Sequence, residues 1–577
     1  MTVTPPRAEH TTATPAPSRS DAPDPGGRTT FVSRGFLARA AFVTVVLSLA
    51  GAVLGLGRDQ ALAHLFGAGR ETDAFLVAWT VPEFAATLLI EDGLAFALVP
   101  AFSAVVARRA HGDTGDPGDP VRALVRGTLP QLVLAFSVAS ALLVWGAPYL
   151  VEVLAPGLPD PRLAIDCTRL TGTCVLTFGL AGYCSAVLRA HRRFVAPAAI
   201  YVAYNTALIT AMFVLGGRWG VRAAAIGVAV GGALMVVAQL PSVVRQLRRR
   251  KAATAPEAAE AAEAATTDTT DTTEALDPGD PAGDPAAGRH AMNLALLLTV
   301  LLFALCRQSQ VLIERFLAST LPAGAISHLN YAQKVAQMPM VLALMLCTVT
   351  FPVVSQALAE GDTERARDRV ERDLRAVSCV VLLGTAAVVA CAPQLVHVLF
   401  QRGAFTAQDT AATAAVMRVY ALGLLGHALV GALVRSYFSA GRPTWYPVAA
   451  MTAGIVATAC LGAWTVGSWG VLGIAAANAA GITLTALILL HGMGTRGVPI
   501  RTRSLLAAMG RPLRAAVAAC GAGAFAASLV DSPALGLTVG GTAVTVLFLL
   551  LAGTPGGQGL TPALRTVTRR LPHARFR

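Results

Sequence analysis

The sequence predicts an all-α polytopic membrane protein, and three observations support this fold class. Of 577 residues, 54% are hydrophobic and only 14% are charged, and the mean hydropathy is +0.59. A soluble chain of this length cannot easily bury so much apolar surface, whereas a polytopic membrane protein turns much of it toward lipid. Apolar runs long enough to cross a hydrocarbon core of about 30 Å recur along the chain. Basic residues collect in the short segments between these runs, which indicates membrane topology rather than nucleic-acid binding.

The first part of the chain is expected to be a polar tail followed by six spans. Residues 1–35 are rich in Pro, Thr, Ser and Asp, a composition typical of disorder, so we expect a cytoplasmic tail there. The tail lacks the apolar core of a signal peptide, so the first apolar run is expected to remain as a span. Residues 36–243 form the expected N-terminal six-helix bundle, with spans at 36–57, 73–102, 129–155, 165–188, 196–216 and 221–243.

A polar segment at residues 244–291 separates these spans from the rest. It opens with the basic run RQLRRRK and continues with repeated Ala, Glu, Asp, Thr and Pro. Such a segment cannot bury enough apolar area to fold, so we expect a flexible cytoplasmic linker. Its Thr-Asp repeats could be phosphorylated and recruit a cytoplasmic regulator, although a solvated spacer is the simpler interpretation.

Eight further spans are expected after the linker, giving about fourteen transmembrane helices in all. Residues 292–491 form the expected C-terminal six-helix bundle, residues 492–552 carry two additional transmembrane helices, and residues 553–577 form a basic cytoplasmic tail. The expected spans lie at 292–318, 326–358, 376–400, 411–438, 444–465, 468–491, 512–530 and 534–552.

Loop charges and short motifs support this division. With both termini in the cytoplasm, most arginine clusters fall in inner loops, where basic residues are normally enriched. RWGV at 218–221 matches SWGV at 468–471, and ValPro-x-x-Ser at 99–103 matches PhePro-x-x-Ser at 351–355. Two halves related by such a repeat imply a central site where they meet, as in transporters that alternate access.

Charged residues inside the expected second span need an explanation. Glu83, Glu91 and Asp92 interrupt a strongly apolar stretch at residues 55–103. An ionisable group near the bilayer centre costs at least about 2.5 kcal/mol, so such groups usually face a bundle interior or a wet cavity. At about 100° per residue, Glu83 and Glu91 differ by about 80° and can share a helix face, whereas Asp92 is about 180° from Glu83.

Two alternatives remain open for these carboxylates. They either couple transport to a proton or another cation, or pair with Arg307 and Lys334 in the other half. Glu314 lies seven residues after Arg307, two helical turns along the same side, so both can line one cavity wall. Glu314 therefore joins the coupling or pairing candidates, and Arg315 is expected nearer the outer interface. Arg307 and Lys334 are candidate cations for an anionic head group.

Two charged residues near the first outer loop are also candidates. Arg58 either lines a cavity or extends to the outer interface beside Asp59. Asp73 either serves transport or caps the second helix, because Thr72 or Asp73 before an apolar run is an ordinary N-terminal signal.

Other kinds of chemistry find no support in the sequence. The nine cysteines lie almost entirely in apolar segments without CxxC pairs, and the histidines show no metal-ligand spacing. No hydrolase or nucleotide-binding motif occurs. We therefore expect no metal, no cofactor, no nucleic-acid partner and no enzymatic activity.

Several motifs together resemble the MurJ/MviN family of lipid II flippases. No single motif is specific, but their order and spacing match the family over residues 36–490. The motifs are Arg-Asp at 58–59, GAG at 67–69, TDAF at 72–75, HLNYAQKVAQMP at 328–339, FPVVS at 351–355 and VLFQRGAF at 398–405.

The resemblance implies the MOP-superfamily fold, with two bundles and two extra helices that form a lipid-facing groove. It also implies flipping of lipid II, the polyprenyl-pyrophosphate-linked peptidoglycan precursor, in a bacterial cytoplasmic (inner) membrane. A cationic cavity would hold the head group while the polyprenyl tail stays among membrane lipids. Arginine suits a pyrophosphate because its fork donates in parallel to the oxygens. Arg58 and Asp73 match family positions, and with Arg307 and Lys334 they form the expected substrate-binding set.

The chain departs from the family pattern at other cationic positions. Family arginines fall on Ala52, Ala86 and Thr87, and an Asp-Arg pair falls on Gln333 and Lys334. Alternative functions are therefore a flippase for another lipid-linked glycan, a small-molecule exporter of the same superfamily, or a non-transporting scaffold for cell-wall proteins.

Overall fold

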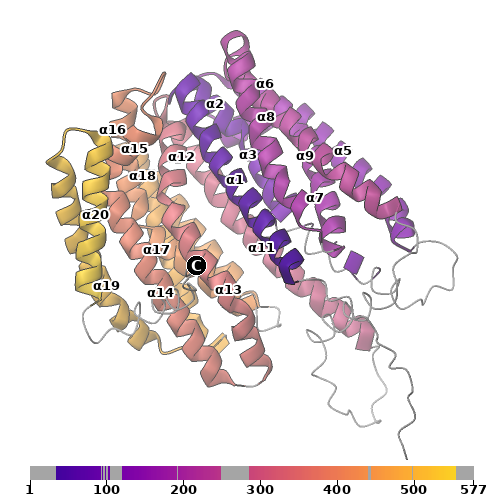
Figure 1. Cartoon of the computed structure of the whole chain (residues 1–577). Helices are drawn as coiled ribbons and strands as arrows, with labels where there is room; N and C mark the ends of the chain where they lie inside the picture. The colour runs from indigo at the N-terminus through magenta and orange to yellow at the C-terminus, as the bar shows by residue number, and fades with distance from the viewer. Residues whose placement is uncertain are drawn as a thin grey trace, which may run out of the picture.

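The fold is all-helical in a computed structural model of the chain (Figure 1). This confirms the predicted class. Nine helices in the described part are long and apolar enough to cross a membrane, or up to ten if the bent pair α16 (Ala407–Ala421) and α17 (Leu424–Phe438) is one span. The count of fourteen stays a prediction. The structure describes residues 34–91, 94, 98, 102–103, 105, 120–191, 193–248, 285–360, 362–438, 444–496, 498 and 500–553.

The first bundle is built around α8, which packs between α1 and α9. Small residues on α9 let these helices approach closely, since a Cβ added to Gly231 would lie 2.7 Å from the Tyr204 ring. The helices of this bundle are α1 (Arg34–Phe66), α2 (Arg70–Ala78), α3 (Thr80–Ala85), the π-helix η1 (Ala86–Glu91), α5 (Pro120–Leu154), α6 (Pro161–Gly172), α7 (Cys174–Ala190), α8 (Val195–Trp219) and α9 (Arg222–Arg248).

The expected second span is broken rather than straight. Its described part is divided into α2, α3 and the π-helix η1. Pro82, in the first turn of α3, cannot donate a backbone hydrogen bond, and a π-helix does not advance by 100° per residue. The prediction that Glu83 and Glu91 share a face therefore rests on a geometry that this segment does not have.

The second bundle contains a long helix that folds back on itself. α18 is interrupted at Gly470, where φ is 54°, and its two arms pack so tightly that a Cβ added to Gly454 would lie 2.6 Å from the Gly481 carbonyl oxygen. The helices of this bundle, besides α16 and α17, are α11 (Pro285–Ser319), α12 (Ala325–Ala336), α13 (Met338–Ala359), α14 (Thr363–Ala390), α15 (Ala392–Phe400) and α18 (Tyr446–Arg496).

The last two helices form a pair at the edge of the second bundle. α19 (Thr502–Ser528) and α20 (Pro533–Ala552) pack against α14 and α15 (Figure 1). Their interface is made of small and apolar side chains, including Cys391, Ala519 and Val544. Arg501, just before α19, also bonds to Asp368 and Glu371 on α14. The pair is therefore attached to the second bundle along its length.

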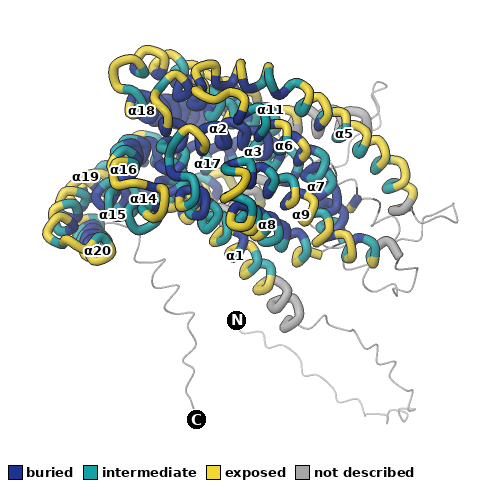
Figure 2. Tube along the Cα trace, turned by 90° about the horizontal axis from the view of Figure 1, so that it is seen from above, coloured by how far each residue is buried: buried dark blue, intermediate teal, exposed yellow. Residues whose placement is uncertain are grey.

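The two bundles meet through α1, α2, α3 and α5 on one side and α11, α12 and α15 on the other. Seen from above, buried segments gather around α2, α3 and α17, and exposed ones follow outer helices such as α5 and α20 (Figure 2). The exposed residues of α5 include Leu134, Trp145 and Val153, as expected for a surface that faces lipid.

Some predictions lie outside the described residues. These are Asp92, nearly all of both tails (1–35 and 553–577) and most of the linker at 244–291. The domain boundaries stay predictions.

We expect the attachment of α20 to depend on Gly540 and not on its neighbour Gly541. A Cβ at Gly540 would lie 2.8 Å from Ala527 Cβ and 2.9 Å from Cys391 Sγ, whereas nothing lies within 4 Å of one at Gly541. Gly540→Val should destabilise the protein by about 1–3 kcal/mol through overpacking. Thermal unfolding of the purified full-length protein measures the effect, and Gly541→Val is the matched control. Equal melting temperatures for the two variants would contradict this packing.

Candidate functional site

A pocket lies between the two bundles. Its walls come from α1, α2 and α8 of the first bundle and from α12 of the second. Arg58 and Lys334, both predicted to bind substrate, therefore face one pocket from opposite sides. The lining residues are Arg58, Asp59, Leu62, Phe75, Leu76, Trp79, Leu208, Asn330 and Lys334.

Arg58 is held firmly in this pocket. Its Nε and Nη2 atoms donate to Asp59 Oδ1 at 2.9 and 2.7 Å, and its guanidinium lies 4.6 Å from the centre of the Trp79 ring. Nη1 reaches Asn205 Oδ1 at 3.4 Å. Since α1 continues to Phe66, Arg58 lies within the helix rather than at its end, and its side chain is only 14% exposed. Asp59 thus compensates its charge and fixes its direction.

Lys334 differs from Arg58 in having no fixed counter-ion. It is half-buried near the end of α12, and no ion pair within 4 Å joins it to a carboxylate in the part of the chain that the structure describes. Glu83 is close enough to interact with it electrostatically. An ammonium group in this setting can bind an anion without first breaking an ion pair.

A partly buried ion pair joins the bundles next to this pocket. Arg315 Nη2 of α11 lies 2.9 Å from Glu83 Oε2 of α3, and the Arg315 side chain is 6% exposed. Arg315 also donates to Thr80 Oγ1. Arg315 lies four residues before the end of α11 at Ser319, where it is buried against α3 rather than exposed. The expectation that it lies nearer the outer interface than Arg307 stays a prediction. Glu83 pairs with Arg315 rather than with Arg307 or Lys334.

The other predicted carboxylates have separate surroundings. Glu314 is buried and accepts a hydrogen bond from the Asn478 amide, while Arg307 on the same helix is exposed. Glu91 is exposed at the end of η1 and accepts a hydrogen bond from the Tyr201 hydroxyl at 2.8 Å. Glu83, Glu91 and Glu314 therefore do not form one cluster.

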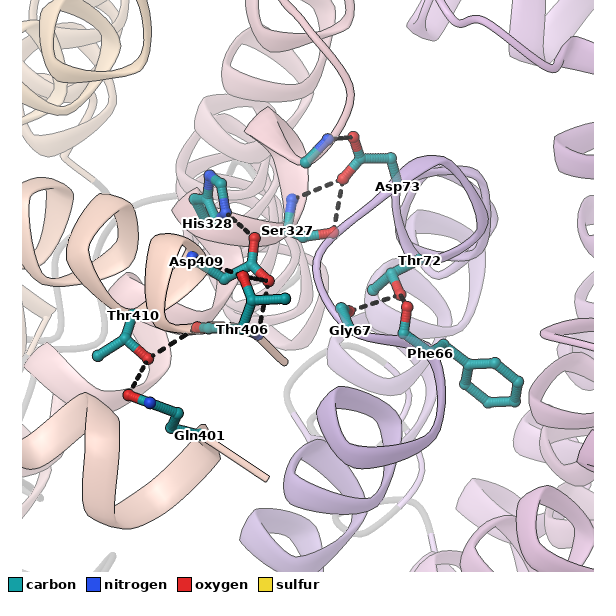
Figure 3. A network of polar contacts seen from close by, with 11 residues as sticks. Phe66, Gly67, Thr72, Asp73, Ser327, His328, Gln401, Thr406, Asp409 and Thr410 are labelled. Carbon is teal, nitrogen blue, oxygen red and sulfur yellow. Dashed lines mark hydrogen bonds and ion pairs between the residues drawn. The ribbon is translucent and has the colours of Figure 1, made fainter. Parts of the chain in front are cut away.

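Asp73 joins the bundles at the end where α2 and α12 begin, which the predicted topology places on the outer side (Figure 3). Its Oδ2 accepts from the Gly324 amide at 2.6 Å, and its Oδ1 accepts from the Ser327 amide at 2.8 Å and the Ser327 hydroxyl at 2.6 Å. These groups begin α12 in the other bundle. A carboxylate there satisfies free amides and complements the helix dipole. The alternative that Asp73 caps its own helix is wrong, because Gly69 is the residue before α2.

Further contacts surround Asp73 at this end. The Ala404 amide donates to the His64 carbonyl oxygen at 2.8 Å, again between bundles. Within the second bundle, His328 Nε2 of α12 lies 3.3 Å from Asp409 Oδ1 of α16 (Figure 3). We call the three bonds of Asp73 to Gly324 and Ser327 the outer latch.

Sequence reasoning identified Asp73 and Glu83 as important but missed their partners. Arg315 is more than two hundred residues from Glu83 along the chain, and only the packing of the bundles brings the two together. The sequence does contain a signal for this pair. A carboxylate inside a span requires a cation, and the segment CRQSQVLIERFL contains two, Arg307 and Arg315. No comparable signal marked the Ser327 and Gly324 amides.

The chain is similar to proteins of one named family. The family model described as lipid II flippase MurJ matches residues 62–537. The lipid II flippase MurJ of Burkholderia cenocepacia is 26% identical, covering 80% of this chain and 84% of that protein. The probable lipid II flippase MurJ of Vibrio cholerae is 25% identical, covering 81% and 85%.

Solved structures show the same fold. A lipid II flippase MurJ in an inward closed conformation has a TM-score of 0.68 at 18% identity, covering 88% of this chain and 98% of that one. An inward-facing multidrug resistance MATE transporter of the MOP superfamily has a TM-score of 0.57 at 13% identity, covering 81% and 99%. At such identities the likeness concerns the fold alone.

We expect Asp73→Asn to weaken the closure of the outer end. An asparagine cannot accept from Gly324 with its amide group, and it removes the charge that complements α12. By comparison with other helix caps, the change should favour opening by about 1–2 kcal/mol, or roughly 5- to 30-fold. A cysteine placed at Asn330, in a chain whose native cysteines are serine, should react correspondingly faster with an impermeant maleimide added outside.

The control is Asp160→Asn. Asp160 caps α6 within the first bundle by accepting from the Leu163 amide at 3.1 Å, so its loss should leave the labelling rate unchanged. If the Asp73→Asn protein and the protein that keeps Asp73 are labelled at equal rates, the role of Asp73 in closure is contradicted.

Proposed function

The chain belongs to the MurJ family of lipid II flippases, and we propose that it moves lipid II across the bacterial cytoplasmic membrane by alternating access. The observation that carries this proposal is the pocket between the bundles, which two cations from opposite bundles line. A site shared between two repeats can open to either side when the repeats rock against each other.

The outer latch supports an alternating mechanism. Asp73 binds α12 of the other bundle through three hydrogen bonds, and the His64–Ala404 bond joins the bundles at the same end. These contacts close the pocket on the outer side. For release of the head group outside, they must break while contacts form at the inner end. We therefore assign Asp73 to closure rather than to direct substrate binding.

Lys334 is the leading candidate for contact with the pyrophosphate. It lines the pocket without a carboxylate partner in the described residues, whereas Arg58 is compensated by Asp59. Arg58 then serves as a fixed donor whose direction Asp59 and Trp79 set. Arg307, exposed on α11, supplies a further cation as the head group enters. This arrangement substitutes for the family arginines that are absent at Ala86 and Thr87.

The polyprenyl tail stays in the membrane under this proposal. α19 exposes large apolar side chains such as Leu513, Val517 and Phe525, which suit contact with a hydrocarbon chain. The protein is a multi-pass membrane protein with both termini in the cytoplasm, and the linker at 244–291 is open to a cytoplasmic regulator. It acts as a transporter rather than an enzyme.

Depletion of the protein should accumulate lipid II in the inner leaflet of the host membrane. Expression of the chain in a MurJ-depleted bacterium should prevent lysis and restore lipid II to the outer leaflet, where an externally added lipid II-cleaving colicin can reach it. Rescue of growth without any change in outer-leaflet lipid II would instead favour a scaffold. Failure to rescue, with export of another lipid-linked glycan or a small molecule by the purified protein, would favour those alternatives.

We expect Lys334→Gln to weaken binding of lipid II by about tenfold or more, since a charge-assisted hydrogen bond is worth about 1.5–3 kcal/mol. Titration of lipid II into the purified full-length protein in nanodiscs measures the affinity. Lys334→Arg keeps the cation and should bind within a few-fold of the original chain. Weak binding by Lys334→Arg and full binding by Lys334→Gln would each rule out the assigned role.

A further inference from the structure

Glu314 has the environment of a group that exchanges a proton. It is 5% exposed, and the Asn478 amide donates to its Oε1. Among the described residues no hydrogen bond reaches its Oε2, and the residue lines a second pocket between α11 and α12, with Ile326, Leu329 and Asn330. Asn330 also lines the pocket that contains Lys334, so α12 separates two adjoining spaces.

The nearest cation is already occupied. Arg315, the next residue, forms an ion pair with Glu83 at 2.9 Å and donates to Thr80. Glu83 and Arg315 therefore balance each other, and within the described part of the chain Glu314 has only a neutral amide as its direct partner. A buried carboxylate without a cation is costly, whereas the neutral acid is not. The sequence left two roles open for these carboxylates, pairing with a cation and coupling to an ion. Glu83 has the surroundings of the first role and Glu314 those of the second.

A hydrogen-bonded chain continues from Glu314 through the second bundle. Because the Asn478 amide nitrogen donates to Glu314, its Oδ1 must accept, and His427 Nε2 lies 3.2 Å from it. His427 Nε2 therefore donates to Asn478, and its 3.5 Å distance to the Tyr420 hydroxyl is a polar contact rather than a second hydrogen bond. Gln333 of α12 and Gln337, the residue that follows α12, donate to the same hydroxyl at 2.9 and 3.2 Å.

This chain of polar groups is unusual inside an apolar bundle. His427 and Tyr420 are buried, and their rings stack at a centroid distance of 5.9 Å. Chains of Asp, Glu and His side chains mark proton relays in membrane transporters, and here the Asn478 amide joins Glu314 to His427. The chain ends at Gln333, next to Lys334 in the sequence.

We propose that Glu314 is a proton-binding site whose occupancy is linked to binding of the anionic head group at Lys334. This inference rests on the proposed function and names its coupling ion. The proton adds to Oε2, which faces the pocket, and no covalent bond to carbon breaks. The charged or titratable groups near Glu314 and its chain, from every helix packed against it, are Arg307 and Arg315 of α11, Glu83 of α3, Lys334 of α12, Tyr420 of α16 and His427 of α17.

The direction of the linkage follows from charge. A pyrophosphate at Lys334 adds negative charge beside Glu83 and Arg315, which makes a second free charge on Glu314 less favourable. Binding of the head group should therefore draw a proton onto Glu314, and protonation should in turn strengthen binding. A proton suits this site better than a metal cation, because Glu314 is the only carboxylate among the described residues that line the pocket and Arg307 and Arg315 lie near the chain of polar groups.

Infrared difference spectroscopy tests the site without any substrate. The full-length protein in nanodiscs should show a protonated carboxyl band that disappears on titration to alkaline pH. Glu314→Gln should remove this band, and Glu314→Asp should shift it, which guards against a folding defect in one variant. Glu152→Gln, at an exposed carboxylate of α5, should leave it unchanged. A band that persists in Glu314→Gln would overturn the proposal.

A second measurement tests the linkage to the head group. At a pH alkaline enough for the infrared band of the substrate-free protein to have disappeared, mixing lipid II with the protein in weakly buffered solution containing a pH dye should take up about one proton per lipid II bound. Glu314→Gln should bind lipid II without proton uptake, and Glu152→Gln should behave like the original chain. Binding with no uptake in the original chain would overturn the linkage. No binding at all would contradict the proposed function, and the infrared band would still decide whether Glu314 holds the proton.

Discussion

Most of this protein is surrounded by hydrocarbon rather than water, and this constraint determines how its charged side chains are accommodated. In the hydrocarbon region a charge must be paired, neutralised or exposed to a wet pocket. Each case occurs here. Glu83 and Arg315 form a pair between bundles, Arg58 is compensated by its neighbour Asp59, and Lys334 faces a pocket. The ion pair between bundles also sets their register, because it fixes α3 against α11.

Much of the fold could be predicted from the sequence because the bilayer imposes a minimum length on each apolar run. The expected spans follow the helices in order, including the two arms of α18 around Gly470. The breaks within spans could not be predicted in the same way. The π-helix at Ala86–Glu91 leaves no composition signal, and an apolar run looks the same whether its helix is straight or bent.

The candidate site was harder to predict because its partners come from distant segments. The sequence indicated Arg58 and Asp73 through the family resemblance and Lys334 as a cation of the other half, and the structure places Arg58 and Lys334 in one pocket. No sequence pattern indicates that Asp73 binds the first turn of α12, because the partners there are backbone amides, which every residue except proline has. The sequence also does not indicate which side of α11 faces which bundle. The contact of Glu314 with the second bundle and of Arg315 with the first could therefore not be predicted.

The short length of α12 has a mechanical consequence. Asp73 binds the first turn of α12, and Lys334 lies two residues before the end of this helix at Ala336. Seven residues of helix separate Ser327 from Lys334, a rise of about 10 Å. A helix this short behaves as a stiff lever, so release of its outer end would tilt the whole segment and displace the lysine. One buried carboxylate between the bundles can thereby set the position of a cation two helical turns away.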